Sequence, residues 1–145
     1  MSIRPFHAND LAALLDIYAK SKLDELIYEG REFVLLPLDQ DQKRLAELQE
    51  SDIYVCEDNG IVGYGALFGS EIRALFVLPN CRGKGIGKLL LKHLLSLVEK
   101  PTVLYVAKSN APAKSLYETF GFRVTEEFET TYNSVPVLAN KMVRA

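Results

Sequence analysis

The sequence is poor in the residues from which cross-linked, metal-binding and nucleophilic sites are built. Among its 145 residues there are two cysteines, two histidines and no tryptophan. Cys56 falls in a predicted strand and Cys81 in a loop, without the paired spacing that a zinc site or a disulfide framework requires. His7 and His93 have no ligand or triad spacing. We therefore expect no metal site, no disulfide, and no Ser-His-Asp or Cys-His nucleophile.

Long apolar runs and an excess of charge of one sign are also missing. No apolar stretch approaches the ~20 residues that span a bilayer, and the N-terminus lacks the apolar core and cleavage site of a signal peptide. The net charge is only -2, so no global basic field is available to hold nucleic acid or an anionic membrane. We expect a cytoplasmic protein with no nucleic-acid partner and no membrane partner.

What is present describes an ordinary α/β domain. With 48% hydrophobic and 25% charged residues, the chain fits one domain, 1–145, that buries roughly two-thirds of its unfolded surface. Between the predicted elements, residues 22–38 are expected to form a short helix and a loop. Apolar spacing predicts helices at about 11–21, 39–50, 83–99 and 111–120, and strands at 2–4, 53–57, 61–68, 72–77, 102–106, 122–131 and 135–143.

The most informative segment leads from an apolar strand through a glycine-rich loop into a leucine-rich helix. Residues 82–87 read Arg-Gly-Lys-Gly-Ile-Gly. The first N–H groups of a helix lack intrahelical partners, the macrodipole adds partial positive charge there, and glycines expose the backbone. The glycine spacing excludes a dinucleotide fingerprint, and Leu89 after Lys88 excludes a Walker loop. The loop therefore predicts a site for a phosphate or pyrophosphate.

A second pattern follows at the next predicted helix. It consists of Asn110, Ala113, Leu116, Tyr117, Gly121 and Phe122. Together the two blocks resemble the acyl-coenzyme A loop and the following helix of the GNAT superfamily of N-acyltransferases. The resemblance covers residues 3–142 and is weakest at 22–38. It implies a single-domain α/β fold with a mixed sheet of about seven strands, about four flanking helices and splayed central parallel strands.

The resemblance also implies roles for individual residues. The coenzyme would lie between the splayed strands, and the Val77 N–H would stabilise an oxyanion. Tyr117 would protonate the leaving thiolate. An amine attacks only when neutral, and Glu71 is the candidate base that takes its proton. The residues implied to bind the coenzyme are Phe76, Val77, Arg82, Gly83, Lys84, Gly85, Ile86, Gly87, Lys88 and Asn110.

The implied activity is the direct transfer of an acetyl group from acetyl-CoA to a primary amine in a ternary complex. Acetyl-CoA would be the acyl-donor substrate, no metal is needed, and the acceptor would be a small molecule or a peptide. The family often forms homodimers, to which the apolar closing hairpin would contribute. A non-catalytic acyl-CoA-binding regulatory module is the alternative from another functional class.

Each candidate residue also has a purely structural interpretation. Tyr117 would be an amphipathic core residue, Glu71 a solvated charge at a strand edge, and Lys84 and Lys88 part of a solvated helix face. Asp24 would belong to an exposed acidic helix. Candidates for the wall of the acceptor site are Glu25, Tyr28, Tyr64 and Tyr132, because in the family the early helices and the last hairpin flank that site.

Overall fold

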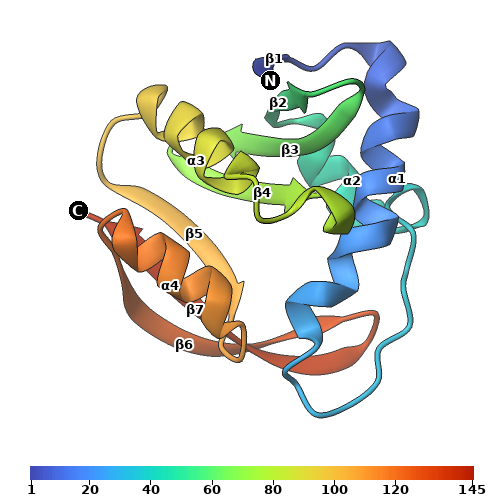
Figure 1. Cartoon of the computed structure of the whole chain (residues 1–145). Helices are drawn as coiled ribbons and strands as arrows, with labels where there is room; N and C mark the ends of the chain where they lie inside the picture. The colour runs from blue at the N-terminus through green and yellow to red at the C-terminus, as the bar shows by residue number, and fades with distance from the viewer.

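The computed structural model describes residues 1–145 and contains one mixed sheet with helices on both faces (Figure 1). The strands are β1 (Ser2–Pro5), β2 (Asp52–Glu57), β3 (Ile61–Phe68), β4 (Glu71–Val77), β5 (Thr102–Ala107), β6 (Phe122–Tyr132) and β7 (Val135–Arg144). The helices are α1 (Leu11–Ser21), α2 (Gln42–Gln49), α3 (Ile86–Ser96) and α4 (Ala111–Thr119). The predicted α/β fold with seven strands and four helices is confirmed. None of the helices is long and apolar enough to cross a membrane.

The strands follow the order β1-β2-β3-β4-β5-β7-β6, and only β4 and β5 run parallel. Helix α1 packs on the face of the sheet that carries Val55 and Tyr64, together with Leu48 of α2. Helix α3 covers the other face, where Leu90 contacts Cys56 and Val62. Alternate residues of one strand therefore feed two separate apolar layers, as the two-residue period of a strand requires.

Strands β4 and β5 pair only at their first residues. The register joins Glu71 to Val103 and Ile72 to Leu104, and no pairing follows. Arg73 is an extra residue in β4, since Ala74 and Ile72 oppose consecutive residues of β3. Such a bulge bends a strand and increases its twist. The two strands consequently separate toward their carboxyl ends (Figure 1), as the sequence predicted for this pair.

Helix α3 approaches β3 closely because two glycines face it. A Cβ atom added to Gly63 would lie 2.8 Å from the Phe76 carbonyl oxygen, and one added to Gly65 would lie 2.8 Å from Leu94 Cδ1. The helix is shorter than predicted, Ile86–Ser96 instead of about 83–99. The predicted apolar face was also too wide, because Leu89 and Leu97 are exposed. Leu90, Leu91 and Leu94, on the face of the helix that contacts the sheet, are fully buried.

The segment between α1 and α2 forms three-residue and five-residue 3₁₀ turns rather than a second α-helix. The short helix predicted near Leu26 is the 3₁₀ segment η2 (Lys22–Leu26), and η3 (Leu38–Gln40) precedes α2. The N-cap of α2 is Asp41, whose side chain accepts from the Arg44 N–H, whereas the sequence predicted that this helix begins at about residue 39. The turn η3 takes up Asp39 and delays the start of the helix to Gln42.

Replacing Gly63 by alanine should destabilise the fold. The new methyl group would meet the Phe76 carbonyl, which is rigid backbone, so the free energy of unfolding should fall by about 1–3 kcal/mol. Gly87→Ala is the matched control, because a Cβ there meets only Val77 Cγ2 at 3.9 Å and alanine favours a helix. Urea unfolding measures both variants. Equal stability of the Gly63→Ala variant and the parent protein would contradict the close contact.

Candidate functional site

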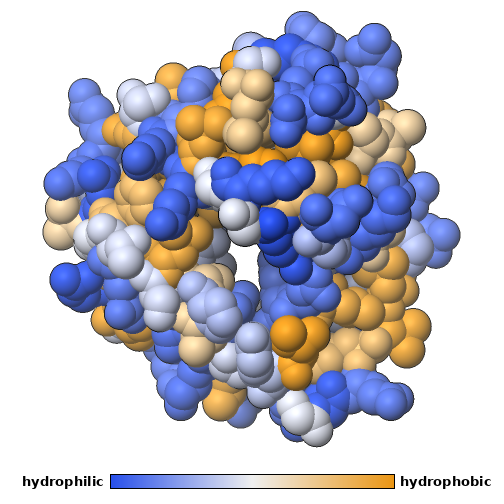
Figure 2. Space-filling view, viewed as in Figure 1, coloured by the Kyte–Doolittle hydropathy of each residue, from blue (hydrophilic) through white to orange (hydrophobic).

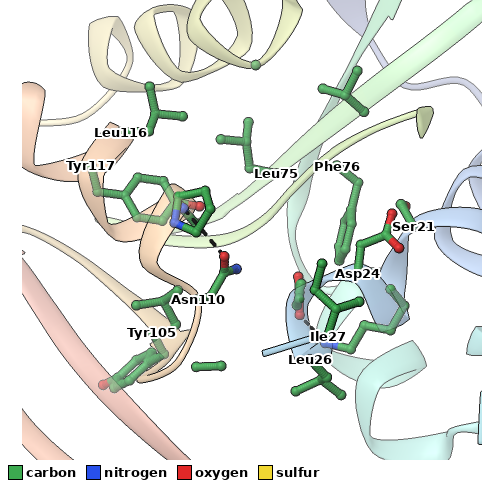
Figure 3. Close-up of a pocket in the computed structure, with 18 of the residues that line it drawn as sticks. Ser21, Asp24, Leu26, Ile27, Leu75, Phe76, Tyr105, Asn110, Leu116 and Tyr117 are labelled. Atoms are coloured by element: carbon green, nitrogen blue, oxygen red, sulfur yellow. Dashed lines mark hydrogen bonds and ion pairs between the residues drawn. The ribbon is translucent and has the colours of Figure 1, made fainter. Parts of the chain in front are cut away.

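A cavity of about 1080 Å³ fills the gap between β4 and β5. Figure 2 shows its opening near the centre of the molecule, with polar and apolar residues around the rim. In Figure 3, Tyr117, Leu116 and Asn110 lie on one wall, opposite Phe76 and Asp24. The cavity is lined by both separated strands, the N-terminus of α3, the helix α4 and the segment that follows α1. It therefore brings together elements from the whole length of the chain.

The backbone of β4 faces the cavity at alternate residues. The Leu78 N–H donates to the Val62 carbonyl at 2.9 Å, so the antiparallel ladder directs the N–H of Phe76 toward β3. The same alternation turns the backbone groups of Leu75 and Val77 toward β5, which is no longer paired at this level. Val77 thus presents an N–H and a carbonyl to the cavity. The Phe76 side chain instead packs against the rings of Tyr18 and Tyr64.

The N-terminus of α3 has free hydrogen-bond donors. Its N-cap is Gly85, in the left-handed region at φ 79, and no side chain caps the helix. The first intrahelical bond joins the Leu89 N–H to the Gly85 carbonyl at 3.0 Å, so the N–H groups of Ile86, Gly87 and Lys88 have no helical partner. A Cβ at Gly85 or at Gly83 would meet nothing within 4 Å. The loop is an open cradle into which an anion can enter.

The basic residues of the loop lie in different surroundings. Arg82 lines the cavity, and its guanidinium is 2.7 Å from the Asp24 carboxylate of η2. Lys88 lines the cavity and also an adjoining hollow of about 480 Å³ that it shares with Lys92. Lys84 does not line either space. All the other residues that the sequence singled out for the coenzyme do line the main cavity.

Helix α4 contributes Asn110 and Tyr117 to the opposite wall. Asn110 is the N-cap, and its side-chain oxygen accepts from the Ala113 N–H at 3.4 Å. Tyr117 packs edge-on against Phe122 and lines the cavity. Burial raises the pKa of the Tyr117 hydroxyl above its ordinary value of 10.0, and the negative charge of Glu25 raises it further. At neutral pH Tyr117 is therefore a phenol that can donate a proton.

Glu71 lies at the narrow end of the cavity, where β4 and β5 are still paired. Its carboxylate is 3.7 Å from the Arg73 guanidinium. Arg73 is held in turn by Glu50 at 2.6 Å and stacks on the ring of Phe68. Glu71 is thus accessible from the cavity and close to a positive charge.

The wall expected to face an acceptor is built from segments far apart in sequence. The Tyr132 hydroxyl accepts from the Leu36 N–H at 2.8 Å, and the Asn133 side chain donates to the Val34 carbonyl at 3.1 Å. These bonds fasten the loop after η2 to the turn between β6 and β7. Of the acceptor-side candidates, Glu25 and Tyr28 line the cavity, whereas Tyr64 and Tyr132 do not.

Two charged residues of this wall were not identified from the sequence. Lys22 and Arg44 both line the cavity, and both place their cationic groups over the ring of Tyr132. A signal was available for Lys22, because it follows Tyr18 by four residues and so shares a helix face with it. No local pattern could have placed Arg44, because its partner Tyr132 is distant in the chain.

Residues 49–124 match the family described as acetyltransferase (GNAT) domain. The peptidyl-lysine N-acetyltransferase YjaB of Salmonella typhimurium is 38% identical over 77 residues, 53% of this chain and 52% of that protein. The aligned segment thus spans about half the length of this relative.

Two solved structures are similar over nearly all of the chain. The solution structure of apo-form YjaB from Escherichia coli has a TM-score of 0.75 at 26% identity, covering 99% of this chain and 97% of that one. The structure of yncA from Salmonella typhimurium, a putative acetyltransferase with its cofactor acetyl-CoA, has a TM-score of 0.72 at 22% identity, covering 99% and 92%.

Four of the seven tyrosines should resist ionisation in alkaline solution while the chain is folded. Burial raises the pKa of four of them, namely Tyr18, Tyr64, Tyr117 and Tyr132. Below the ordinary tyrosine pKa of about 10 they are neutral in both folded and unfolded chains, so they leave stability unchanged. Above it only the unfolded chain ionises them, and stability falls as pH rises. Alkaline titration followed by ultraviolet absorbance and circular dichroism checks this, and ionisation of these four tyrosines near pH 10 in a folded chain would contradict it.

Proposed function

Since the chain belongs to the GNAT acetyltransferase family, we propose that it transfers an acetyl group from acetyl-CoA to a primary amine. The observation that carries the proposal is the meeting of three features in one cavity: an uncapped helix N-terminus, unpaired backbone of β4 and a neutral tyrosine. Each supplies a different part of the chemistry of acyl transfer. The relative YjaB is named for peptidyl-lysine, so an amino group of a protein is one candidate acceptor for this chain.

The donor site fits a pyrophosphate-bearing thioester. The N–H groups of Ile86, Gly87 and Lys88 point out of the helix end, and the macrodipole favours negative charge there. Arg82 supplies a guanidinium that pairs bidentately with phosphate oxygens once it leaves Asp24. The pantetheine arm would then extend along β4, where the backbone of Leu75 and Val77 offers donors and acceptors. Bound acetyl-CoA supplies the activated acetyl group.

The protein's own groups act at three atoms. The Val77 N–H would donate to the acyl oxygen, where negative charge develops as the amine attacks. Glu71 is the proposed acceptor of the proton that the amine loses. Tyr117 would give its proton to the departing sulfur and regain one from solvent. The new bond joins the amine nitrogen to the acyl carbon, and the bond that breaks joins that carbon to sulfur.

The alternative is a module that binds acyl-CoA without transferring the acyl group. Tyr117 favours transfer, because a binding module has no use for a proton donor in the cavity wall. The two functions differ in one measurement, which is the release of free thiol from acetyl-CoA in the presence of an amine panel. Release that depends on the amine supports the enzyme, and coenzyme binding without release supports the module.

Tyr117→Phe should lower kcat by about 10²-fold, because it removes the proton donor to the leaving group while keeping the ring. Coenzyme affinity should change little. Tyr54→Phe is the matched control, since Tyr54 packs against His93 and does not line the cavity. Thiol release at several pH values measures both variants. A Tyr117→Phe rate equal to that of the parent protein across pH would remove Tyr117 from the mechanism.

Gly85→Glu should abolish coenzyme binding, because it places a side chain and a negative charge in the open cradle at the end of α3. The control is Gly69→Glu, which introduces the same side chain at a glycine that also has positive φ and open space but lies outside the cavity. Both carry similar backbone strain. Calorimetric titration with coenzyme A should show binding only to the control and the parent protein. Retained binding by Gly85→Glu would show that the loop is not the pyrophosphate site.

A further inference from the structure

The ammonium group of Lys22 is enclosed inside the cavity wall. The side chain is only 13% exposed, and Nζ lies 2.8 Å from the Glu25 carboxylate. Three aromatic rings surround the same nitrogen, with centroids 5.4–5.9 Å away. We call these four groups the Lys22 cage: the rings of Tyr18, Phe76 and Tyr132 and the carboxylate of Glu25.

The cage has the composition of a cation-binding site. Ring faces attract an ammonium group within about 6 Å, and a carboxylate adds a charge-assisted hydrogen bond. The rings come from three separate elements, α1, β4 and β6, which converge at one point. Ordering and burying a lysine is unfavourable in general, since lysine loses much rotamer freedom and is rarely enclosed. The three rings and the carboxylate offset that cost at Lys22.

Part of the cage borders the cavity, since Phe76 and Glu25 line it and the rings of Tyr18 and Tyr132 lie behind them. Lys22 and Glu25 line the same cavity as Tyr117, and Phe76 of the cage lies between the two β4 residues that face the gap. Figure 3 shows Phe76 and Asp24 across the cavity from Tyr117. The charge of Glu25 also contributes to the raised pKa of Tyr117.

The neighbouring cation does not fill the cage. Arg44 lies over the other part of this wall, 5.1 Å from the Tyr132 centroid, and its charge is paired with Asp41 at 3.1 Å. The Tyr18 hydroxyl is buried and has no hydrogen-bond partner.

We infer that the Lys22 cage is the ammonium subsite of the acceptor and that Lys22 occupies it in the free protein. The acceptor then presents an unbranched primary alkylammonium, the chemistry of Lys22 itself. A lysine side chain and a free aliphatic amine share this group. The inference rests on the proposed function, because an acceptor has a role only where an acyl group is transferred.

The test measures binding of n-butylammonium to the full chain by NMR titration, without acetyl-CoA. Lys22→Ala empties the cage and should bind this probe about tenfold or more tightly than the parent protein, because an internal competitor acts at millimolar effective concentration or above. Adding Glu25→Gln to Lys22→Ala should reverse the gain. Nα-acetyl-lysine amide is titrated in parallel. Tighter binding of this probe indicates a lysine side chain as the source of the ammonium group, and tighter binding of n-butylammonium indicates a free aliphatic amine.

Lys20→Ala is the matched control. Lys20 also pairs with a carboxylate, Asp16 at 3.0 Å, but on the exposed side of α1. Its loss should leave binding of both probes unchanged. If Lys22→Ala does not fold, Lys22→Gln takes its place, because it keeps half of the aliphatic stem and removes the charge.

Equal binding by the Lys22 and Lys20 variants, or no effect of Glu25→Gln, would overturn the subsite. Coenzyme A affinity of the same proteins is measured alongside. Failure of the cage with coenzyme binding and acetyl transfer intact overturns this inference alone. Absence of coenzyme binding in the parent protein overturns the proposed function and the acceptor role of the cage with it.

Discussion

The short parallel contact between β4 and β5 is the constraint on which the rest of the structure depends. Two residue pairs join the strands, and the bulge at Arg73 then turns β4 away. Backbone groups of Leu75 and Val77, which an intact sheet would have paired, are left for a ligand. The same divergence separates α3 from α4 and creates the cavity between them. One local irregularity thus produces both the space and its hydrogen-bonding wall.

Polar side-chain contacts join the segments around the cavity, where β4 and β5 are no longer paired. Arg82 of the donor loop pairs with Asp24, and Ser109 of the β5–α4 loop donates to the Glu29 carboxylate. Tyr132 holds the loop after η2 through its hydroxyl. These contacts are polar and lie near the cavity, so they can exchange partners with a ligand at little expense to the apolar core. The walls of the cavity are therefore joined by backbone pairing where β4 and β5 meet, and by exchangeable side-chain contacts at the open end.

The sequence predicted the parts of the molecule that local pattern controls. Asn59-Gly60, a dipeptide typical of hairpin turns, joins two predicted strands with positive φ at both residues, and Gly121 follows α4 at φ 94. The glycine-rich loop and Tyr117 were singled out as site candidates because glycine spacing and a helical motif are local features. The ends of α3 were misplaced because leucines continue beyond the sheet that could bury them. Asp39 competed with Asp41 for the same cap, and tertiary packing decided between them.

The wall expected to face an acceptor could not be predicted from the sequence, for a physical reason. Its contacts join residues about a hundred positions apart, such as Leu36 and Tyr132, and no periodicity encodes such a meeting. Residues 22–38 contain little regular structure, so propensity gives no register from which to place Lys22 or Arg44. The motif-rich half of the chain therefore predicts the loop and helix proposed to bind the coenzyme, whereas the wall proposed to face the acceptor can be described only from the three-dimensional structure.

Two neighbouring carboxylates on η2 face different partners. Asp24 reaches Arg82 at the donor loop, and Glu25 reaches Lys22 within the cage. A change of one residue in the length of the preceding helix would rotate this turn and carry both carboxylates out of place together. An insertion or deletion here would therefore disturb the loop proposed to bind the coenzyme and the proposed acceptor subsite together. A point substitution within the Lys22 cage would change the proposed acceptor subsite and leave that loop in place.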